Sequence, residues 1–339
     1  MLTIVMYHYV RDMPNTPWPA IRGLLTHDFE GQLDYIGRHY TVISLDQLLA
    51  ATYDDGPPLP GNACLLTFDD GLRDHHDVVL PRLLDRGMSG AFFPIADAVE
   101  NGVVMIVHRV HHILASGVEM GALFHELLEL IDAWRDAYEL PSTADLLAAC
   151  IPGAVRYDDA RTIQFKRLLQ QALPRQAAWA IAGELFRRHV SADEAGFAEE
   201  LYLSIDQLRT MASLGMGIGG HGVRHDWMEH LSRHGQREKM LRSREFLSRI
   251  HGAMPEAWLM NYPYGSYDAR TVALAREIPG CRLAVTTRPG LIADFSKPYE
   301  LPRLDTNDLP RQGDAPPCAW TLAVREAMER GGETSREVA

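Results

Sequence analysis

Short apolar runs alternate with amphipathic stretches along the N-terminal part of the chain. Residues 63–68 form the clearest run, and they are continuously apolar, as buried parallel strands are. An amphipathic stretch over 74–86 ends at Gly87, a typical helix terminator. A further apolar run over 90–95 completes a strand–helix–strand order, which predicts a parallel sheet flanked by helices. The same rhythm predicts strands over 2–7 and 41–44 and helices that begin at Thr26 and over 45–51.

The alternation stops after residue 97 and resumes near residue 202. Residues 98–201 carry helical patterns and no convincing strand. Ser204, followed three residues later by Gln207, then predicts a capping box at the start of a helix. The later elements are predicted as strands over 216–220, 257–262 and 281–286, and as helices over 235–250 and 268–278.

This interruption predicts how the domains are organised. We expect a discontinuous α/β domain formed by residues 1–97 and 202–316, a helical insertion over 98–201 and a C-terminal tail over 317–339. The insertion carries apolar helix faces, which must pack against something. Two roles are open for it: a lid that restricts the site to a small substrate, or an element through which the chain forms a homodimer.

Charge and composition narrow the classes of partner. The chain has 339 residues, with 33 Lys and Arg against 45 Asp and Glu, so its formal net charge is −12. Such a surface repels phosphate backbones and anionic membranes, so no nucleic-acid partner is expected. No apolar stretch is long enough to form a transmembrane segment, and the first residues lack the basic region of a signal peptide. A cytoplasmic location is therefore expected.

Two carboxylates follow the clearest strand, in the sequence Asp69-Asp70-Gly71. In parallel α/β folds, the carboxyl ends of the strands form the edge where ligands bind. Adjacent side chains on an extended backbone point in opposite directions, and a turn at Gly71 allows both carboxylates to reach one cavity in different roles. The alternative is structural, because aspartate is also favoured near the positive end of a following helix.

A histidine pair follows a later strand, in the sequence from His221 to His225. Histidines at positions i and i+4 face the same side of a helical turn, so both imidazoles are expected to bind one cation. A pair of this spacing also arises by chance. Two imidazoles and one carboxylate are a typical catalytic zinc set, and the second carboxylate is then free to act as a base on water.

At this point the sequence resembles the polysaccharide deacetylases, also called the NodB-homology or carbohydrate esterase 4 family. The segment from Thr67 to Gly71 looks like the first family motif, and the segment from His221 to His225 looks like the second. Further similarities are Tyr262-Pro263-Tyr264-Gly265 to the third motif, Met6-Tyr7-His8 to the start of one branch, and Leu301-Pro302-Arg303 to a late segment of it. The resemblance implies a distorted (β/α) barrel with seven or eight strands.

The resemblance also implies a reaction and the residues that carry it. Asp70, His221 and His225 would bind a divalent metal, which in this family is usually zinc. Cobalt and nickel suit the same ligands. Asp69 would be the general base, and the backbone N–H of Tyr264 would hold the oxyanion. The third motif, Tyr262, Pro263 and Tyr264, would contact the substrate. The implied activity removes an N-acetyl or related N-acyl group from an amino sugar or a sugar-containing intermediate, releasing acetate and a free amine.

Three positions depart from the family pattern. Gly222 stands where the second motif usually has Ser or Thr, and Asn261 stands where the third motif often has the Arg that orients the base. Arg303 is a candidate substitute for that Arg. The Leu-x-His motif that supplies the general acid is absent near 302–310, and His8 is our candidate to act near the site instead. His8 could equally be a hydrogen-bonded core histidine.

Five further histidines and two rival functions are also to be considered. We expect His108, His111 and His112 on a solvated or interface helix face, and His75 and His76 either near substrate or in a surface role. One rival function is a metal-independent C–N hydrolase of cyclic ureides or imides on the same fold. The other is a sugar-binding relative without catalysis.

Overall fold

The predicted parallel sheet is present, and it curves into a distorted barrel. In the computed structural model, which describes residues 1–53, 55–150 and 158–337, hydrogen-bonded neighbours follow the order β5-β4-β3-β1-β8, and β6 pairs with β7. Single parallel bridges join Gly220 to Met260 and Val285 to Leu301. Because residue 301 leads into β8, these bridges close a ring of seven strands within the described residues. β2 pairs with β3 outside this ring. The α/β barrel prediction is confirmed.

The strands are short, and most of their residues are buried. Their bounds are β1 (Leu2–Tyr7), β2 (Thr41–Val42), β3 (Ala63–Asp70), β4 (Ala91–Pro94), β5 (Gly217–Ile218), β6 (Trp258–Asn261), β7 (Cys281–Val285) and β8 (Leu304–Asp305). All eight residues of β3 are buried. This strand continues past the predicted end at residue 68, because Asp69 and Asp70 remain in register with Phe93 and Pro94 of β4.

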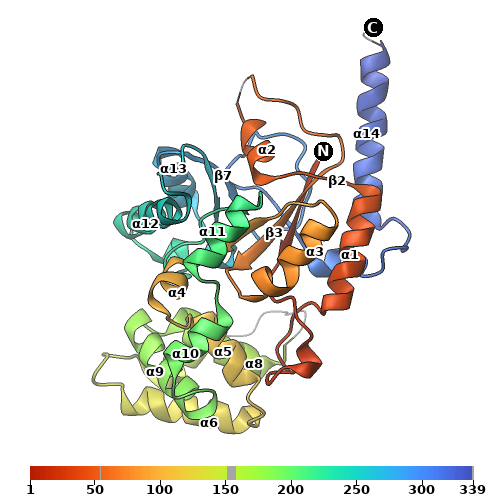
Figure 1. The fold of residues 1–339 in the computed structure, drawn as a ribbon. Helices are drawn as coiled ribbons and strands as arrows, with labels where there is room; N and C mark the ends of the chain where they lie inside the picture. Colours follow the sequence, from red (N-terminus) through yellow and green to blue (C-terminus); the bar gives the residue numbers. More distant parts are fainter. Residues whose placement is uncertain (54, 151–157, 338–339) are drawn as a thin grey trace. The chain divides into compact units, whose positions relative to one another are not determined.

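Helices flank the barrel, as the strand–helix rhythm predicts. Their bounds are α1 (Thr26–His39), α2 (Leu45–Ala50), α3 (Leu80–Asp85), α4 (Ala96–Asn101), α11 (Ile205–Ser213), α12 (Arg233–His251), α13 (Ala269–Glu277) and α14 (Ala319–Glu337). The capping box of Ser204 and Gln207 is formed at the start of α11. Helices α12 and α13 lie side by side, and α13 lies next to β7 (Figure 1). One turn of π-helix, η2 (His75–Val79), precedes α3.

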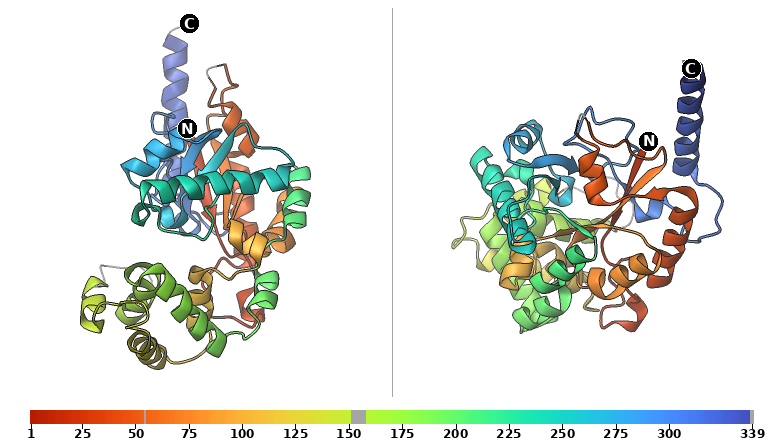
Figure 2. Two further views of the ribbon diagram at one scale, coloured as in Figure 1. Left: turned by 90° about the vertical axis from the view of Figure 1, so that its left-hand side faces the viewer. Right: turned by 45° about the horizontal axis from the view of Figure 1, so that its top comes forward.

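A second group of helices forms a compact unit of its own (Figure 2). It contains α5 (Ile106–Leu114), α6 (Met120–Ala133), α7 (Thr143–Ala149), α8 (Ala160–Arg167), α9 (Arg175–His189) and most of α10 (Glu194–Leu201). No strand occurs among residues 102–150 and 158–198. Arg109 of α5 pairs with Glu194, donates to the carbonyl of Trp179 of α9 and lies over the Trp179 ring.

The boundaries of the two units differ from the predicted segments. The barrel unit comprises Met1–Arg11, Gly23–Asn101 and Glu199–Ala339, and the helical unit comprises Asp12–Arg22 and Gly102–Ala198. The segment Asp12–Arg22 joins the helical unit because the Trp18 ring packs edge-on against the rings of His112 and Phe197. No periodic pattern marks such a contact between distant segments.

The C-terminal segment, predicted as a tail, contains a helix. Residues 319–337 form α14, and Thr321 Oγ1 lies 2.7 Å from the hydroxyl of Tyr35 and 2.8 Å from that of Tyr40. These contacts attach the start of α14 to the barrel unit. No helix in the described residues is both long enough and apolar enough to span a membrane.

Candidate active site and metal centre

The carboxylates of Asp69 and Asp70 lie at the carboxyl end of β3, and each meets a different set of partners. Asp70 has a φ of 75°, in the left-handed region, and Gly71 follows with a φ of 68°. A Cβ at residue 71 would lie 2.7 Å from the Cα of Pro94, so only glycine fits this turn. The turn separates the two carboxylates: Asp69 faces Arg303, and Asp70 faces two imidazoles.

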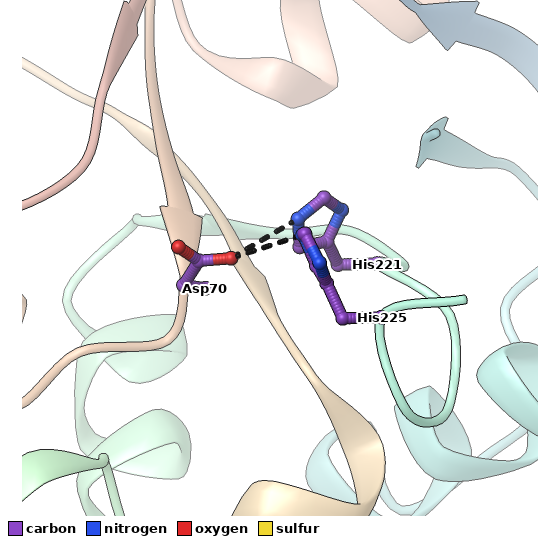
Figure 3. Close-up of side chains that lie close together, drawn as sticks. All are labelled: Asp70, His221 and His225. Atoms are coloured by element: carbon purple, nitrogen blue, oxygen red, sulfur yellow. Dashed lines mark ion pairs between the residues drawn. The ribbon is translucent and has the colours of Figure 1, made fainter. Parts of the chain in front are cut away.

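The structure brings together Asp70, His221 and His225, which the sequence predicts as metal ligands. Asp70 Oδ1 lies 3.3 Å from His221 Nε2 and 3.4 Å from His225 Nε2. Figure 3 shows both imidazoles facing this carboxylate. The three side chains offer ligand atoms within 4.8 Å of one another, close enough to hold one ion.

The hydrogen bond on the far side of His221 supports such an ion. Its Nδ1–H donates to the carbonyl of Asn261 at 3.0 Å, so in the neutral ring Nε2 carries a lone pair toward Asp70. A lone pair and a carboxylate oxygen at 3.3 Å repel one another unless a cation or a proton lies between them. The donor set of one carboxylate and two imidazoles, largely buried, therefore fits a divalent metal.

The backbone that presents the two histidines is not the helical turn expected from their spacing. Residues 221–225 form an irregular loop after β5, with φ angles of 72° at Gly222 and 56° at His225. The loop, rather than an i, i+4 helix face, aims both rings at Asp70. It also explains Gly222, because φ there lies in the region that glycine adopts most readily, and a Cβ would approach Pro263 Cγ to 3.2 Å.

Asp69 is buried and paired with Arg303. Both carboxylate oxygens accept hydrogen bonds from the guanidinium at 2.8 Å. Arg303 also donates to Asn261 Oδ1 at 3.0 Å, to Thr67 Oγ1 at 3.1 Å and to the carbonyl of Thr286 at 2.8 Å. These five bonds use all five guanidinium N–H groups, so the side chain has one fixed position. Asn261 stands where the resemblance places an orienting Arg. Here its Oδ1 accepts a hydrogen bond from Arg303, which pairs with Asp69.

This pairing controls the charge of Asp69. Burial acts to raise the pKa of its carboxyl group, but the positive charge of Arg303, with His8, the Arg303 hydrogen bonds and His221, outweighs burial and lowers the pKa to about 2. Asp69 is therefore ionised at neutral pH and can accept a proton.

His8 lies at the end of β1, beside Asp69. Its Nε2 is 3.7 Å from Asp69 Oδ2, and 43% of its side chain is exposed, so it is not a core histidine. The core histidine is His75, which is fully buried and hydrogen-bonds through Nε2 to the carbonyl of His8 at 3.0 Å. Neither the substrate-contact nor the surface expectation for His75 describes this position. His76, in contrast, is half-buried and pairs with Asp77.

The third motif divides between core and site. Tyr262 is fully buried in the hydrophobic core, and its ring stacks on Tyr267, so substrate contact through its side chain is not supported. Tyr264 has a φ of 57°, and its ring lies between His225, at a centroid distance of 4.2 Å, and Trp227, at 4.4 Å and an interplanar angle of 10°. Sequence reasoning missed Trp227, since an aromatic residue near the histidine motif carries no distinctive spacing.

The histidines of α5 contradict the expected solvated face. His108 and His112 are buried within the helical unit, and His112 Nδ1 lies 2.8 Å from the carbonyl of His108. The rings of Trp18 and Phe197 contact His112 edge-on. Aromatic neighbours from two distant segments cover this face of the helix.

Comparisons with known proteins agree with this geometry. The polysaccharide deacetylase family model matches residues 157–280, which include His221, His225 and the third motif but not Asp69 or Asp70. The comparison with curated proteins gives no match.

Several solved structures share the fold. The Streptococcus pyogenes deacetylase PplD, in complex with acetate, is 17% identical at a TM-score of 0.55, over 90% of this chain and 91% of that one. IcaB from Ammonifex degensii is 17% identical at 0.53, over 96% of both chains. The BpsB deacetylase domain from Bordetella bronchiseptica is 15% identical at 0.50, over 90% and 95%.

The similarity therefore has two parts: residues 157–280 match the polysaccharide deacetylase family model, and the fold is shared with solved deacetylases.

Proposed function

We propose that this chain is a metal-dependent de-N-acylase that removes an acetyl or related acyl group from the nitrogen of an amino sugar or a sugar-containing biosynthetic intermediate. Acetate and a free amine are the products. The observation that carries the proposal is that Asp70, His221 and His225 face one another beside the Asp69–Arg303 pair. Zinc suits this ligand set best, and cobalt and nickel are the alternatives to be measured. A divalent cation held there would polarise the acyl carbonyl and increase the acidity of a water molecule.

The protein's own groups divide the remaining work. Asp69, ionised and held by Arg303, takes the proton of the attacking water. His8, at the exposed side of Asp69, gives a proton to the departing amine nitrogen. The backbone N–H of Tyr264 donates to the oxyanion, and Pro263 and the Tyr264 ring line the substrate side.

Specific contacts disfavour the two rival functions. A metal-independent hydrolase would have no use for a largely buried carboxylate facing two imidazoles. A sugar-binding protein without catalysis would have no use for a carboxylate held ionised by a fully buried Arg303. Both features are costly to bury and are typical of active sites.

The decisive experiment measures metal content and acetate release on the same preparation. We expect about one divalent ion per chain, and acetate from at least one member of a panel of N-acetylated oligosaccharides, nucleotide-linked sugars and lipid-linked sugars. Asp69→Asn should abolish turnover while the metal is retained, whereas Asp77→Asn, on an exposed carboxylate, should leave both unchanged. A metal-loaded protein that releases no amine from any N-acyl sugar would contradict the proposal, and activity without metal would favour the metal-independent hydrolase.

The helical insertion predicted over residues 98–201 keeps two proposed roles. We propose that residues 98–201 act as a lid over a small substrate or as the contact of a homodimer. Light scattering of the purified chain distinguishes them, because a dimer doubles the measured mass. The cytoplasmic location likewise stays a prediction, and fractionation of cells that carry the tagged chain would check it.

A further inference from the structure

His75 contacts the segment that carries His8 and has no place in the reaction as proposed. Its side chain is fully buried, and its ring lies against the rings of Phe68 and Phe92. Its Nε2 is 3.0 Å from the carbonyl oxygen of His8. Since a carbonyl only accepts, Nε2 carries the proton and donates it.

The local backbone gives His75 this position. It opens the π-turn η2, where the N–H of Leu80 bonds to the carbonyl of His75 across five residues. Pro81 follows and has no N–H to donate back to this turn. Such wide turns within helices often occur at functional sites.

Asp74 provides a second, independent attachment of the same segment. Its Oδ2 accepts from the backbone N–H of Val10 at 3.3 Å and from Nε of Arg11 at 2.7 Å. The turn after β3 therefore holds residues 8, 10 and 11 through adjacent side chains. The strand that leads into this turn ends with Asp69, the proposed base, and Asp70, so one continuous stretch of chain carries the base and holds the segment of the proposed acid.

We propose that His75 is a positioning residue that fixes His8 for proton transfer to the leaving amine. This rests on the proposed function. In that step the water proton goes to Asp69, the water oxygen bonds to the acyl carbon, and the carbon–nitrogen bond breaks. Its electron pair stays on nitrogen, which takes the proton of His8 Nε2. Without the bond from His75, the carbonyl of residue 8 loses its contact with the core, although Asp74 still holds residues 10 and 11, and the distance from His8 to the site is less well defined.

Leaving-group dependence provides the test. An amide requires protonation of the departing nitrogen, whereas 4-nitrophenyl acetate releases a phenolate that leaves without a proton. His75→Phe keeps a ring between Phe68 and Phe92 and removes the donor. We expect kcat for the N-acetyl sugar to fall about tenfold or more, within what a general acid contributes, and hydrolysis of 4-nitrophenyl acetate to fall less than about twofold. His75→Gln, which restores an N–H donor, should recover most of the amide activity.

His76→Gln is the matched control, because His76 is the adjacent histidine and points to Asp77 instead. It should leave both substrates unaffected. If His75→Phe does not fold, His75→Met replaces it in the test, because Met also lacks the N–H donor and packs more adaptably. Equal losses on amide and ester would indicate general structural damage and overturn the proposal.

A double-mutant cycle with His8→Ala gives a second, separate criterion. If His75 acts through His8, the double variant should have the amide kcat of His8→Ala alone, within about twofold. Multiplicative losses would overturn the inference. Failure of the proposed function is distinguishable, because then the wild-type protein releases no amine from any N-acyl sugar and the cycle has no starting rate.

Discussion

Arg303 and Asp69 form a two-point ion pair inside the barrel, with each carboxylate oxygen 2.8 Å from a guanidinium nitrogen. The pair joins the segment before β8 to the end of β3, which are far apart in sequence. Because every other N–H of Arg303 is also bonded, the carboxylate cannot rotate without breaking several contacts at once.

Replacement of Arg303 should damage both turnover and stability. Arg303→Ala leaves the buried Asp69 without its partner, and we expect the free energy of unfolding to fall by about 3–5 kcal/mol and kcat by about a hundredfold. Arg311→Ala, which breaks an exposed pair with Asp28, should cost less than about 1 kcal/mol. Urea unfolding and acetate release measure both. Unchanged turnover in Arg303→Ala would show that Arg303 does not orient the base.

His75 should make stability depend on pH. Burial lowers the pKa of its imidazole to about 4 from the usual 6.5, although the bond to the His8 carbonyl acts in the opposite direction. The folded state favours the neutral ring, so this contribution is complete above pH 6.5 and is lost as pH falls toward about 4. Between pH 7.5 and pH 5 we expect a loss of about 2 kcal/mol in unfolding free energy. In His75→Gln this pH-dependent loss of unfolding free energy should be absent. Identical pH profiles of stability in the variant and the wild type would contradict the prediction.

Metal binding should stabilise the fold through its three proposed ligands. Zinc at about a hundred times its dissociation constant adds about 2.7 kcal/mol, so we expect the wild-type Tm to rise by roughly 5 °C. His221→Ala should abolish the rise, whereas His230→Ala, on an exposed histidine, should keep it. Differential scanning fluorimetry after chelation and after zinc addition gives the measurement. An equal rise in all three proteins would place the zinc elsewhere.

Gly222 should tolerate a side chain less well than another glycine with the same backbone. Gly222 has a φ of 72° and Gly252 a φ of 75°, but only at residue 222 would a Cβ meet another residue within 4 Å. Alanine should therefore cost about 1–2 kcal/mol at either position, with the larger loss at 222. Only Gly222→Ala should also weaken metal binding, since it moves the loop between the two histidines. Calorimetric zinc titration of both variants tests this difference.

Trp227 should affect kcat because its ring holds Tyr264 in place. The aromatic stack, worth about 0.5–1.5 kcal/mol, offsets the left-handed backbone of Tyr264, whose N–H is the proposed oxyanion donor. Trp227→Ala should lower kcat about tenfold, and Trp227→Phe should retain most activity. Trp134→Ala, in the helical unit, is the control. A KM effect without a kcat effect would assign Trp227 to substrate binding instead.

Local patterns predicted the elements that depend on nearby residues. The buried strand before Asp69, the capping box at Ser204 and the absence of strands among the described residues of the insertion all follow from short-range periodicity and backbone hydrogen bonding. The irregular loop from His221 to His225 does not, because its positive φ angles at Gly222 and His225 follow no periodic pattern, and the space at Gly222 is limited by Pro263, which is far away in sequence.

The sequence by itself determined which residues are available for chemistry: two carboxylates after one strand, two histidines after another, and an Arg near the C-terminal end of the barrel. Only the tertiary structure decided which carboxylate meets which partner. Asp69 and Asp70 are adjacent and chemically identical, but the turn at Gly71 directs one to Arg303 and the other to His221. The tertiary structure also decided that His75 is the buried core histidine and that His8 is the partly exposed histidine beside Asp69. Such choices depend on packing among segments that are far apart in sequence, and no local spacing encodes them.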